Sequence, residues 1–572
     1  MIKKIIYPVL LLGLAYLLFS SDESKTIIAG IAIFLIGMIF MEDGFKFFSG
    51  GYLEKVLENS TNTIPKSIFT GFLSTSIVQS SSLISIIVIS FLTAGLMSLT
   101  GAIGVIFGSN IGTTTTAWII SSFGMKINIA TYAMPMIIFG VIFKLLSEKN
   151  LQGVGNILIG LGFIFLGIEY MKEGFETLKA GFDLSKYAIS GYLGALVYIL
   201  LGIVATVIIQ SSSATMALII TALASGQIIY MNALELAIGA NIGTTITALI
   251  ASLASNSNGK RLALAHLIFN ITTGAVAIIF LYPIASIVDV LSLKVGISSD
   301  DYAMKLAMFH TIFNILGVLL VSPFIKQLVS YLSKKFVSEK SSKLKALYLD
   351  DVVIKIPDAA TNAIKKEIIH LFDNAVEVIS HGLYLHRHNL LGSDNIEAVV
   401  KNSNLSIKTD VNEFYSNKIK SLYSDIIHFS SLAQENMSEE EKRRIYALKV
   451  ASRDIVEAIK DIRELQKNIS IYLKSNNENI KEEYNYLRIN IAKTIKIINE
   501  LRNCDNCPEL DDKLNILAEN SKLNDDINSD KIDSLIRKNQ ITSKMATSLI
   551  NDSNYAQNII KRLIEAANII WK

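Results

Sequence analysis

Long apolar runs alternate with short polar segments through the first part of the chain, and the pattern then becomes amphipathic. Each run is close to the ~20 residues that an α-helix needs to cross a bilayer. These runs predict membrane-spanning helices at residues 27–48, 99–122, 128–147, 152–171, 232–255, 262–282 and 303–325. We therefore expect an all-α, polytopic membrane domain over residues 1–335.

Two further apolar stretches, residues 63–95 and 190–226, carry the sequence Gln-Ser-Ser-Ser near their centres. A helix that spans the bilayer would not place four consecutive polar side chains against lipid. Irregular backbone at this depth is tolerated where it is buried in protein or lines a cavity. The pattern therefore predicts two re-entrant helical hairpins, each with its tip at the serine run.

These polar interruptions belong to a duplicated unit. Gln79-Ser80-Ser81-Ser82 recurs 131 residues later as Gln210-Ser211-Ser212-Ser213, and the string Gly108–Ala117 recurs as Gly239–Ala248. Upstream, Gly37, Met41, Gly44 and Phe45 recur at an offset of 130 as Gly167, Met171, Gly174 and Phe175. Three strings in one order indicate repeat 1 at about 27–150, repeat 2 at about 152–282, and a final helix to about 330.

The number of crossings sets the relative orientation of the repeats. Repeat 1 crosses three times, so repeat 2 starts from the opposite face, and the pair is expected to have inverted topology, as in many secondary transporters.

The run from Ile5 to Phe19 resembles a signal peptide but lacks a good cleavage site, so we expect a retained first helix. With Lys3 and Lys4 inside, 12 basic residues lie inside and 7 outside, the bias that orients membrane proteins. This places the C-terminal part in the cytoplasm and the protein in the cytoplasmic membrane.

The chemistry of the repeated strings suits two kinds of ion. Neutral hydroxyl and amide oxygens are hard ligands that suit Na+, whereas backbone N–H groups at a helix N-terminus favour an anion. Residues 1–260 contain no arginine. A tetrahedral oxyanion would therefore be held by neutral donors and co-bound cations. The alternative is that small polar residues only let the helices pack closely, but packing does not require one string twice.

The strings Gln79–Ser82 and Asn110–Thr114, with their copies Gln210–Ser213 and Asn241–Thr245, resemble the paired signatures of type II sodium–phosphate cotransporters. The resemblance covers about residues 27–330, and it implies alternating access driven by the inward Na+ gradient. It assigns phosphate binding to Gln79, Ser80, Ser81, Ser82, Gln210, Ser211, Ser212 and Ser213. It assigns sodium binding to Gln79, Ser80, Asn110, Thr113, Thr114, Gln210, Ser211, Asn241, Thr244 and Thr245.

A second echo pairs His266 and Asn270 with His310 and Asn314. Histidine and asparagine at i and i+4 share one helix face, and on an apolar helix that face should point into the bundle. The four side chains could line the transport pathway. We favour a structural role, in which the two motifs hydrogen-bond each other and lock two helices together.

The C-terminal part has a different composition. Of the first 335 residues 34 are charged, against 69 of the remaining 237. Apolar positions at helical spacing predict a soluble bundle over residues 336–572, with helices at 361–390, 407–434, 438–474, 477–503 and 541–570. Its position and length resemble the PhoU type of phosphate-uptake regulator. Glu457 and Asp461, one turn apart, could ligate a metal through oxygen, although a solvated helix face is the alternative.

These patterns favour a sodium-coupled phosphate symporter, regulated by its C-terminal bundle, with Na+ as the co-transported ion and a homo-oligomer as one possible assembly. Neither part is strongly basic, so no nucleic-acid partner is expected. No nucleophile–base pair or phosphate loop indicates an enzyme. Two alternatives stay open: a membrane sensor-regulator of ions or phosphate with little flux, and a symporter of sulfate or arsenate.

Overall fold

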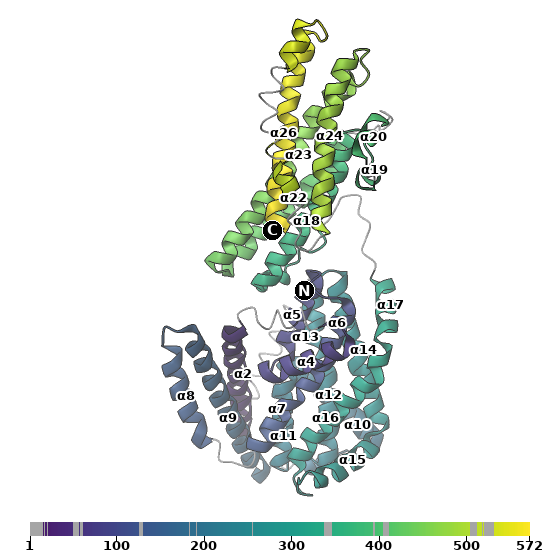
Figure 1. Cartoon of the computed structure of the whole chain (residues 1–572). Coiled ribbons are helices and arrows are strands. Elements are labelled where there is room, and N and C mark those ends of the chain that lie inside the picture. The colour runs from purple at the N-terminus through teal and green to yellow at the C-terminus, as the bar shows by residue number, and fades with distance from the viewer. Residues whose placement is uncertain are drawn as a thin grey trace. The chain divides into compact units, whose positions relative to one another are not determined.

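The computed structural model describes residues 15, 18, 19, 21–49, 57, 61–124, 130–181, 184–189, 191–253, 255–336, 346–392, 395–403, 411–503, 512–516, 519 and 531–571. These residues form helices and turns, with no strand among them, which confirms the all-α prediction. The chain divides into two compact units, Met1–Ser338 and Glu339–Lys572 (Figure 1). The expected first helix lies almost wholly outside the described residues.

The first unit consists of membrane-type helices in the order α2 (Asp22–Ser49), α4 (Ile64–Val78), α5 (Ser81–Thr93), α6 (Leu99–Gly112), α7 (Thr114–Ile119), α8 (Ala130–Lys144), α9 (Lys149–Gly181), α10 (Gly191–Ile209), α11 (Ser212–Ala224), α12 (Tyr230–Gly243), α13 (Thr245–Leu253), α14 (Ser257–Ile279), α15 (Leu281–Lys294), α16 (Tyr302–Val321) and α17 (Ile325–Lys335). Six segments are long and apolar enough to span a membrane: Asp22–Phe45, Leu99–Ser122, Asn150–Lys179, Tyr230–Leu253, Ser257–Ile279 and Tyr302–Lys335. The protein is therefore a multi-pass membrane protein.

One predicted span is described only in part. The apolar run at 128–147 includes α8, described over Ala130–Lys144. The residues directly before it, 125–129, lie outside the described part of the chain, so the length of this span stays a prediction.

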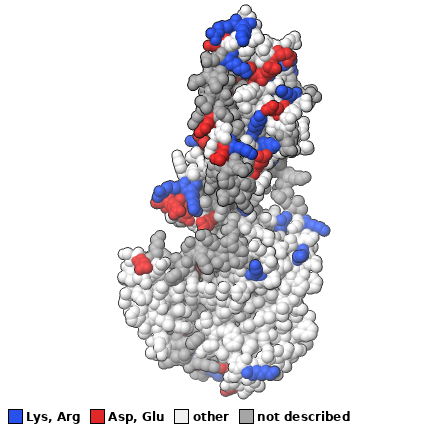
Figure 2. Space-filling model, viewed as in Figure 1, with Lys and Arg blue, Asp and Glu red and all other residues white. Residues whose placement is uncertain are grey.

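The outer surface of the first unit is apolar. Leu200 and Ile208 of α10 are each 60% exposed, and Leu253 of α13 is 79% exposed. On the face that Figure 2 shows, charged residues are sparse over this unit, whereas they are frequent over the second unit. A surface of exposed leucine and isoleucine would be costly in water, and it matches the composition of the surface that lipid covers.

The duplication extends from the sequence to the helix boundaries. Helix α5 begins at Ser81 and α11 at Ser212, and helix α6 ends at Gly112 and α12 at Gly243. Both pairs of boundaries are 131 residues apart. The two copies therefore break their helices at the same positions of the repeat.

Glycines hold each hairpin against the helix that follows it. A Cβ on Gly108 of α6 would lie 1.8 Å from the carbonyl oxygen of Ile68 in α4. Its counterpart Gly239 of α12 would place a Cβ 2.1 Å from the carbonyl oxygen of Ile199 in α10. No side chain fits at these distances, so glycine is required for the two backbones to approach.

Helices α2 and α9, the first helix of each copy, pack along a seam of glycines. A Cβ on Gly30 would lie 2.7 Å from the Gly167 carbonyl oxygen, and one on Gly37 would lie 2.7 Å from that of Gly160. The partner number falls as the α2 number rises, so the helices run antiparallel. Gly160 and Gly167 are themselves the counterparts of Gly30 and Gly37, so each copy makes the same contact with the other. Reciprocal contacts of this kind are the mark of a two-fold relation.

The second unit contains amphipathic helices: α18 (Pro357–Gly382), α19 (Arg387–Gly392), α20 (Ile396–Lys401), α21 (Val411–Phe414), α22 (Lys420–Ala433), α23 (Glu439–Tyr472), α24 (Glu478–Arg502) and α26 (Ser543–Trp571). Helix α23 packs against α18 and α26, and α24 packs against α26. Helix α23 begins with a capping box, in which Ser438 and Glu441 each bond the other's backbone N–H. The apolar faces of these helices form a core of their own.

Candidate substrate and ion site

The tips of both hairpins have the same backbone geometry. Helix α4 ends at Val78 and α10 at Ile209, and the next residue, Gln79 or Gln210, has a left-handed φ of 58° or 57°. Residues other than glycine rarely adopt this conformation. The following serine, Ser80 or Ser211, caps the next helix, and its Oγ accepts a hydrogen bond of 3.2 Å from the backbone N–H three residues later. The predicted helix breaks are therefore present at both Gln-Ser-Ser-Ser strings.

Each tip touches the threonine-rich helix of the other half of the unit. Ser82 Oγ lies 3.5 Å from Thr247 Oγ1 at the start of α13. Thr116 Oγ1 of α7 lies 3.4 Å from Ser213 Oγ of α11. Ser213 is the counterpart of Ser82, and Thr247 is the counterpart of Thr116, at the offset of 131. The two copies thus make the same hydroxyl contact in both directions.

Gln79 is bonded to this hydroxyl group. Its Oε1 accepts a 2.7 Å hydrogen bond from Thr116 Oγ1, and its Nε2 donates one of 2.7 Å to Thr115 Oγ1. Only 7% of Gln79 is exposed. Gln210, in contrast, is exposed and makes no side-chain hydrogen bond to a described residue. The two tips have the same backbone but different side-chain environments.

The threonine-rich segments also break their helices. Helix α6 ends at Gly112 before α7 begins at Thr114, and α12 ends at Gly243 before α13 begins at Thr245. The Oγ1 atoms of Thr114 and Thr245 each donate a 2.8 Å hydrogen bond to the carbonyl three residues earlier. All six predicted sodium candidates of these segments are buried: Asn110, Thr113, Thr114, Asn241, Thr244 and Thr245.

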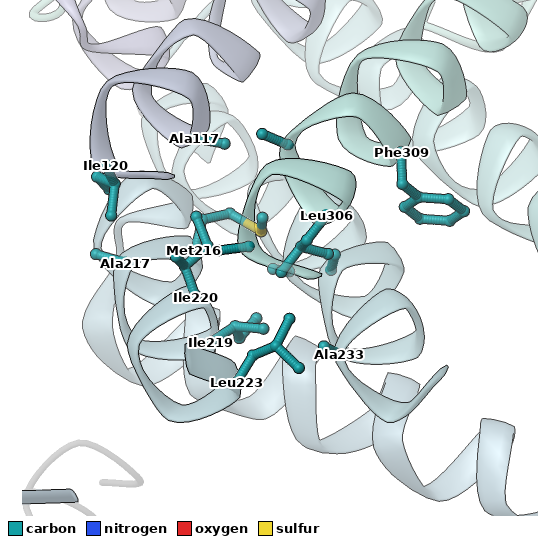
Figure 3. Close-up of a cluster of buried hydrophobic side chains, with 14 of the residues drawn as sticks. Ala117, Ile120, Met216, Ala217, Ile219, Ile220, Leu223, Ala233, Leu306 and Phe309 are labelled. Atoms are coloured by element: carbon teal, nitrogen blue, oxygen red, sulfur yellow. The ribbon is translucent and has the colours of Figure 1, made fainter. Parts of the chain in front are cut away.

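An apolar cluster fixes the elements that carry the hydroxyl contacts. Figure 3 shows Ala117 of α7, and Ile120 directly after this helix, beside Met216 and Ala217 of α11, with Leu306 of α16 close by. These residues are almost fully buried. Because Thr116 and Ser213 directly precede this cluster on α7 and α11, its packing holds their hydroxyl groups together.

Comparison with known proteins identifies the family of the chain. The model of the Na+/Pi-cotransporter family matches residues 33–173 and 187–323. The uncharacterised protein YqeW of Bacillus subtilis is 32% identical over 293 residues, which are 51% of this chain and 92% of the relative. The chain belongs to the Na+/Pi-cotransporter family.

Two other relatives carry functional names. YjbB of Salmonella typhimurium, named as a candidate inorganic phosphate export protein, is 27% identical over 423 residues, 73% of each chain. Human sodium-dependent phosphate transport protein 2B is 40% identical over 100 residues, 17% of this chain and 13% of that protein. No solved structure matches.

In this member of the family, sequence reasoning missed three residues of the candidate site. Thr116 and Thr247 join the tips to the opposite halves, and both lie in the repeated string, so its alignment could have indicated them. The third is Glu42 of α2, whose Oε2 accepts a 3.2 Å hydrogen bond from Ser80 Oγ. The available signal was a carboxylate inside an apolar run, which is costly in a membrane and tends to be functional.

The two histidine–asparagine motifs do not bond each other, so the expected lock between α14 and α16 was wrong. Asn270 pairs with Asn241 of α12, and Asn314 Nδ2 donates to the carbonyl of His310 in its own helix. Both histidines are buried, and neither Nδ1 has a described hydrogen-bond partner. Both motifs are buried as predicted, but Asn270 bonds Asn241 of the repeated string and Asn314 Nδ2 bonds only its own helix.

In the second unit, Glu457 and Asp461 face a cation of the protein. Arg562 of α26 lies 3.6 Å from Glu457 Oε2 and 3.5 Å from Asp461 Oδ2. Burial raises the pKa of the Asp461 carboxyl, and Arg562 partly offsets this shift in pKa. The described residues contain no group of three or more histidine, cysteine, aspartate or glutamate side chains placed to hold a metal. A metal role for the pair therefore stays a prediction.

Proposed function

We propose that the protein is a sodium-coupled symporter of inorganic phosphate that works by alternating access in the cytoplasmic membrane. The observation that carries this proposal is the reciprocal contact of the two tips, Ser82 with Thr247 and Ser213 with Thr116, in a membrane unit of the Na+/Pi-cotransporter family. It draws two hydroxyl-rich breaks from distant parts of the chain into one region.

The chemistry of this region supports a shared anion and cation site. Helices α5 and α11 begin at the serine runs, and the N–H groups of a helix N-terminus favour an anion such as phosphate. The hydroxyl and amide oxygens of Gln79, Thr113 and Thr244 are neutral and hard, as Na+ requires. Because residues 1–260 contain no arginine, co-bound sodium would supply the positive charge that balances phosphate.

The relation between the two halves supports alternating access. The antiparallel, reciprocal seam of α2 and α9 is the contact expected of two inverted-topology repeats. In transporters built this way, one half moves against the other around a site at the middle of the bilayer. The second unit, by its place after the membrane unit, would then be a cytoplasmic regulator of PhoU type.

Transport in proteoliposomes tests the proposal. Purified protein should accumulate labelled phosphate when an inward Na+ gradient is imposed and should stop when potassium replaces sodium. Gln210→Ala and Ser211→Ala should each abolish this uptake, whereas Ser225→Ala, at the far end of α11, should leave it unchanged. Phosphate binding without flux would indicate the sensor-regulator instead.

Two further arms of this experiment separate the remaining alternatives. Uptake of sulfate or arsenate that phosphate does not inhibit would indicate another oxyanion. Because one relative is named as an exporter, flux should also be measured with phosphate inside the vesicles. Efflux that proceeds at an unchanged rate when potassium replaces sodium on both sides would overturn sodium coupling.

A further inference from the structure

The two copies of the string Asn-Ile-Gly-Thr-Thr make different hydrogen bonds at the same backbone position. In the second copy, the side chain of Asn270 in α14 bonds both the backbone and the side chain of Asn241. Its Nδ2 donates a 3.0 Å hydrogen bond to the Asn241 backbone carbonyl, and its Oδ1 accepts one of 3.3 Å from Asn241 Nδ2. The carbonyl at the break of α12 and α13 is thus satisfied from a neighbouring helix.

In the first copy, the same carbonyl is satisfied locally. The Asn110 backbone carbonyl accepts a 2.8 Å hydrogen bond from Thr113 Oγ1. The counterpart of Thr113, Thr244, turns instead to the carbonyl of Ala240, at 3.0 Å. Asn110 Nδ2 is buried and has no hydrogen-bond partner among the described residues.

The residue that corresponds to Asn270 for the first copy lies in α16. Helix α14 packs against α12, α13, α6 and α5, and α16 packs against α6, α7, α12 and α11. Exchanging the two copies converts the first set into the second, so α16 has the neighbours in the first copy that α14 has in the second. The shared string His-x-x-Phe-Asn then pairs Asn314 with Asn270. Asn314 is fully buried, and its Oδ1 also has no described partner.

The two unpartnered atoms are complementary. Asn110 Nδ2 is a donor and Asn314 Oδ1 is an acceptor, the same two atom types that are bonded between Asn241 and Asn270. Leaving a buried donor and a buried acceptor unpaired is costly. A protein that alternates between two structures would bear this cost in each state at one of two equivalent places.

We propose that Asn270 and Asn314 are positioning residues of a two-position latch. In the present state Asn270 is bonded to Asn241, and Asn314 is released from Asn110. In the opposite-facing state the Asn110–Asn314 pair forms and the Asn241–Asn270 pair opens. This inference rests on the proposed alternating access. It explains how the two states stay close in free energy, since each transition exchanges one pair for its equivalent.

Paired variants test the latch by the sign of their effects. Asn270→Ala should shift the population away from the present state, and Asn314→Ala should shift it towards that state, each by about tenfold. In oriented proteoliposomes, the ratio of the apparent phosphate KM values on the two faces should move in opposite directions. The double variant should return the ratio close to the wild-type value. Asn232→Ala, a buried asparagine of α12 outside the latch, should not move it.

Hydrogen–deuterium exchange of the full chain provides a readout that needs no transport. Asn270→Ala should raise exchange in residues 241–248 and lower it in residues 110–117, because the Asn110–Asn314 pair forms when the Asn241–Asn270 pair is lost. A purely structural role would raise exchange at the mutated contact and lower it nowhere. Shifts of the same sign in both variants, or no remote decrease, would overturn the latch. If the wild type shows no phosphate flux, the proposed function fails, and the exchange pattern still decides for or against the latch.

Discussion

The two hairpin tips have the same four residues and the same backbone, yet only one of them is closed by hydrogen bonds. Gln79 is buried between Thr115 and Thr116, whereas Gln210 is exposed. The local sequence determines the left-handed glutamine and the serine cap, because these depend on the residues at the break. The side-chain environment depends on the helix opposite, where the copies differ.

One position accounts for much of the difference. Thr115 accepts from Gln79 Nε2, and its counterpart 131 residues later is Ile246, which has no hydroxyl. Thr247, the counterpart of Thr116, donates to its own backbone at Thr244 rather than to Gln210. The second tip therefore has fewer partners for its glutamine and leaves that amide free for a ligand.

The largest effect should come from the glycines that hold both hairpins. Gly108→Ala would place a Cβ 1.8 Å from a backbone oxygen, and Gly239→Ala one at 2.1 Å. Overpacking against main chain costs ~1–3 kcal/mol or more, so we expect loss of monodisperse protein in size-exclusion chromatography, more severely at Gly108. Gly392→Ala, which has open space around its Cβ, is the control. Normal yields of both hairpin variants would contradict the close approach.

The next effect compares the glutamines directly. Gln79→Ala removes the acceptor of Thr116 and the donor to Thr115, so it should lower the free energy of unfolding by ~1–3 kcal/mol. Gln210→Ala should change it by less than ~0.5 kcal/mol, as at an exposed site. Thermal unfolding of the purified proteins measures both. Equal losses would mean that the tips are not different in this way.

The first helices of the two copies also differ in charge. Glu42 corresponds, at the offset of 130, to Lys172. A charged acceptor strengthens the hydrogen bond from Ser80 and attracts cations, so Glu42→Gln should cost ~1–2 kcal/mol of sodium binding. We expect a several-fold rise in the sodium concentration for half-maximal uptake, with phosphate affinity at saturating sodium little changed. Lys172→Gln serves as the control. An unchanged sodium dependence in the Glu42 variant would remove this carboxylate from the site.

The smallest expected effect is a gain in stability. Ile246→Thr gives the second half the hydroxyl that Thr115 gives the first, so Gln210 should find a partner. One added hydrogen bond should raise the free energy of unfolding by ~0.5–1 kcal/mol, and the closed tip should slow phosphate uptake. Both are measured on the same preparation. Faster uptake together with lower stability would show that Gln210 does not use this position.

Much of this arrangement follows from the sequence. The repeated strings predicted the helix breaks at Gln79 and Gln210, and hydropathy predicted most of the spanning segments. The partner of Asn270 did not follow, because it depends on packing between helices that are distant in the chain. Glu42 was missed for the same reason, since only the fold brings α2 against the first tip. A repeat predicts what the copies share, and tertiary contacts decide where they differ.

The glycine seam between α2 and α9 has a consequence for how such a molecule can be assembled. Each side of the seam carries the same spacing, with Gly30 and Gly37 facing Gly167 and Gly160. A surface that matches itself after a half-turn is complete in one copy. A half-length polypeptide ending near residue 150 would therefore carry a self-complementary helix surface. Two copies in opposite orientations would associate through this surface.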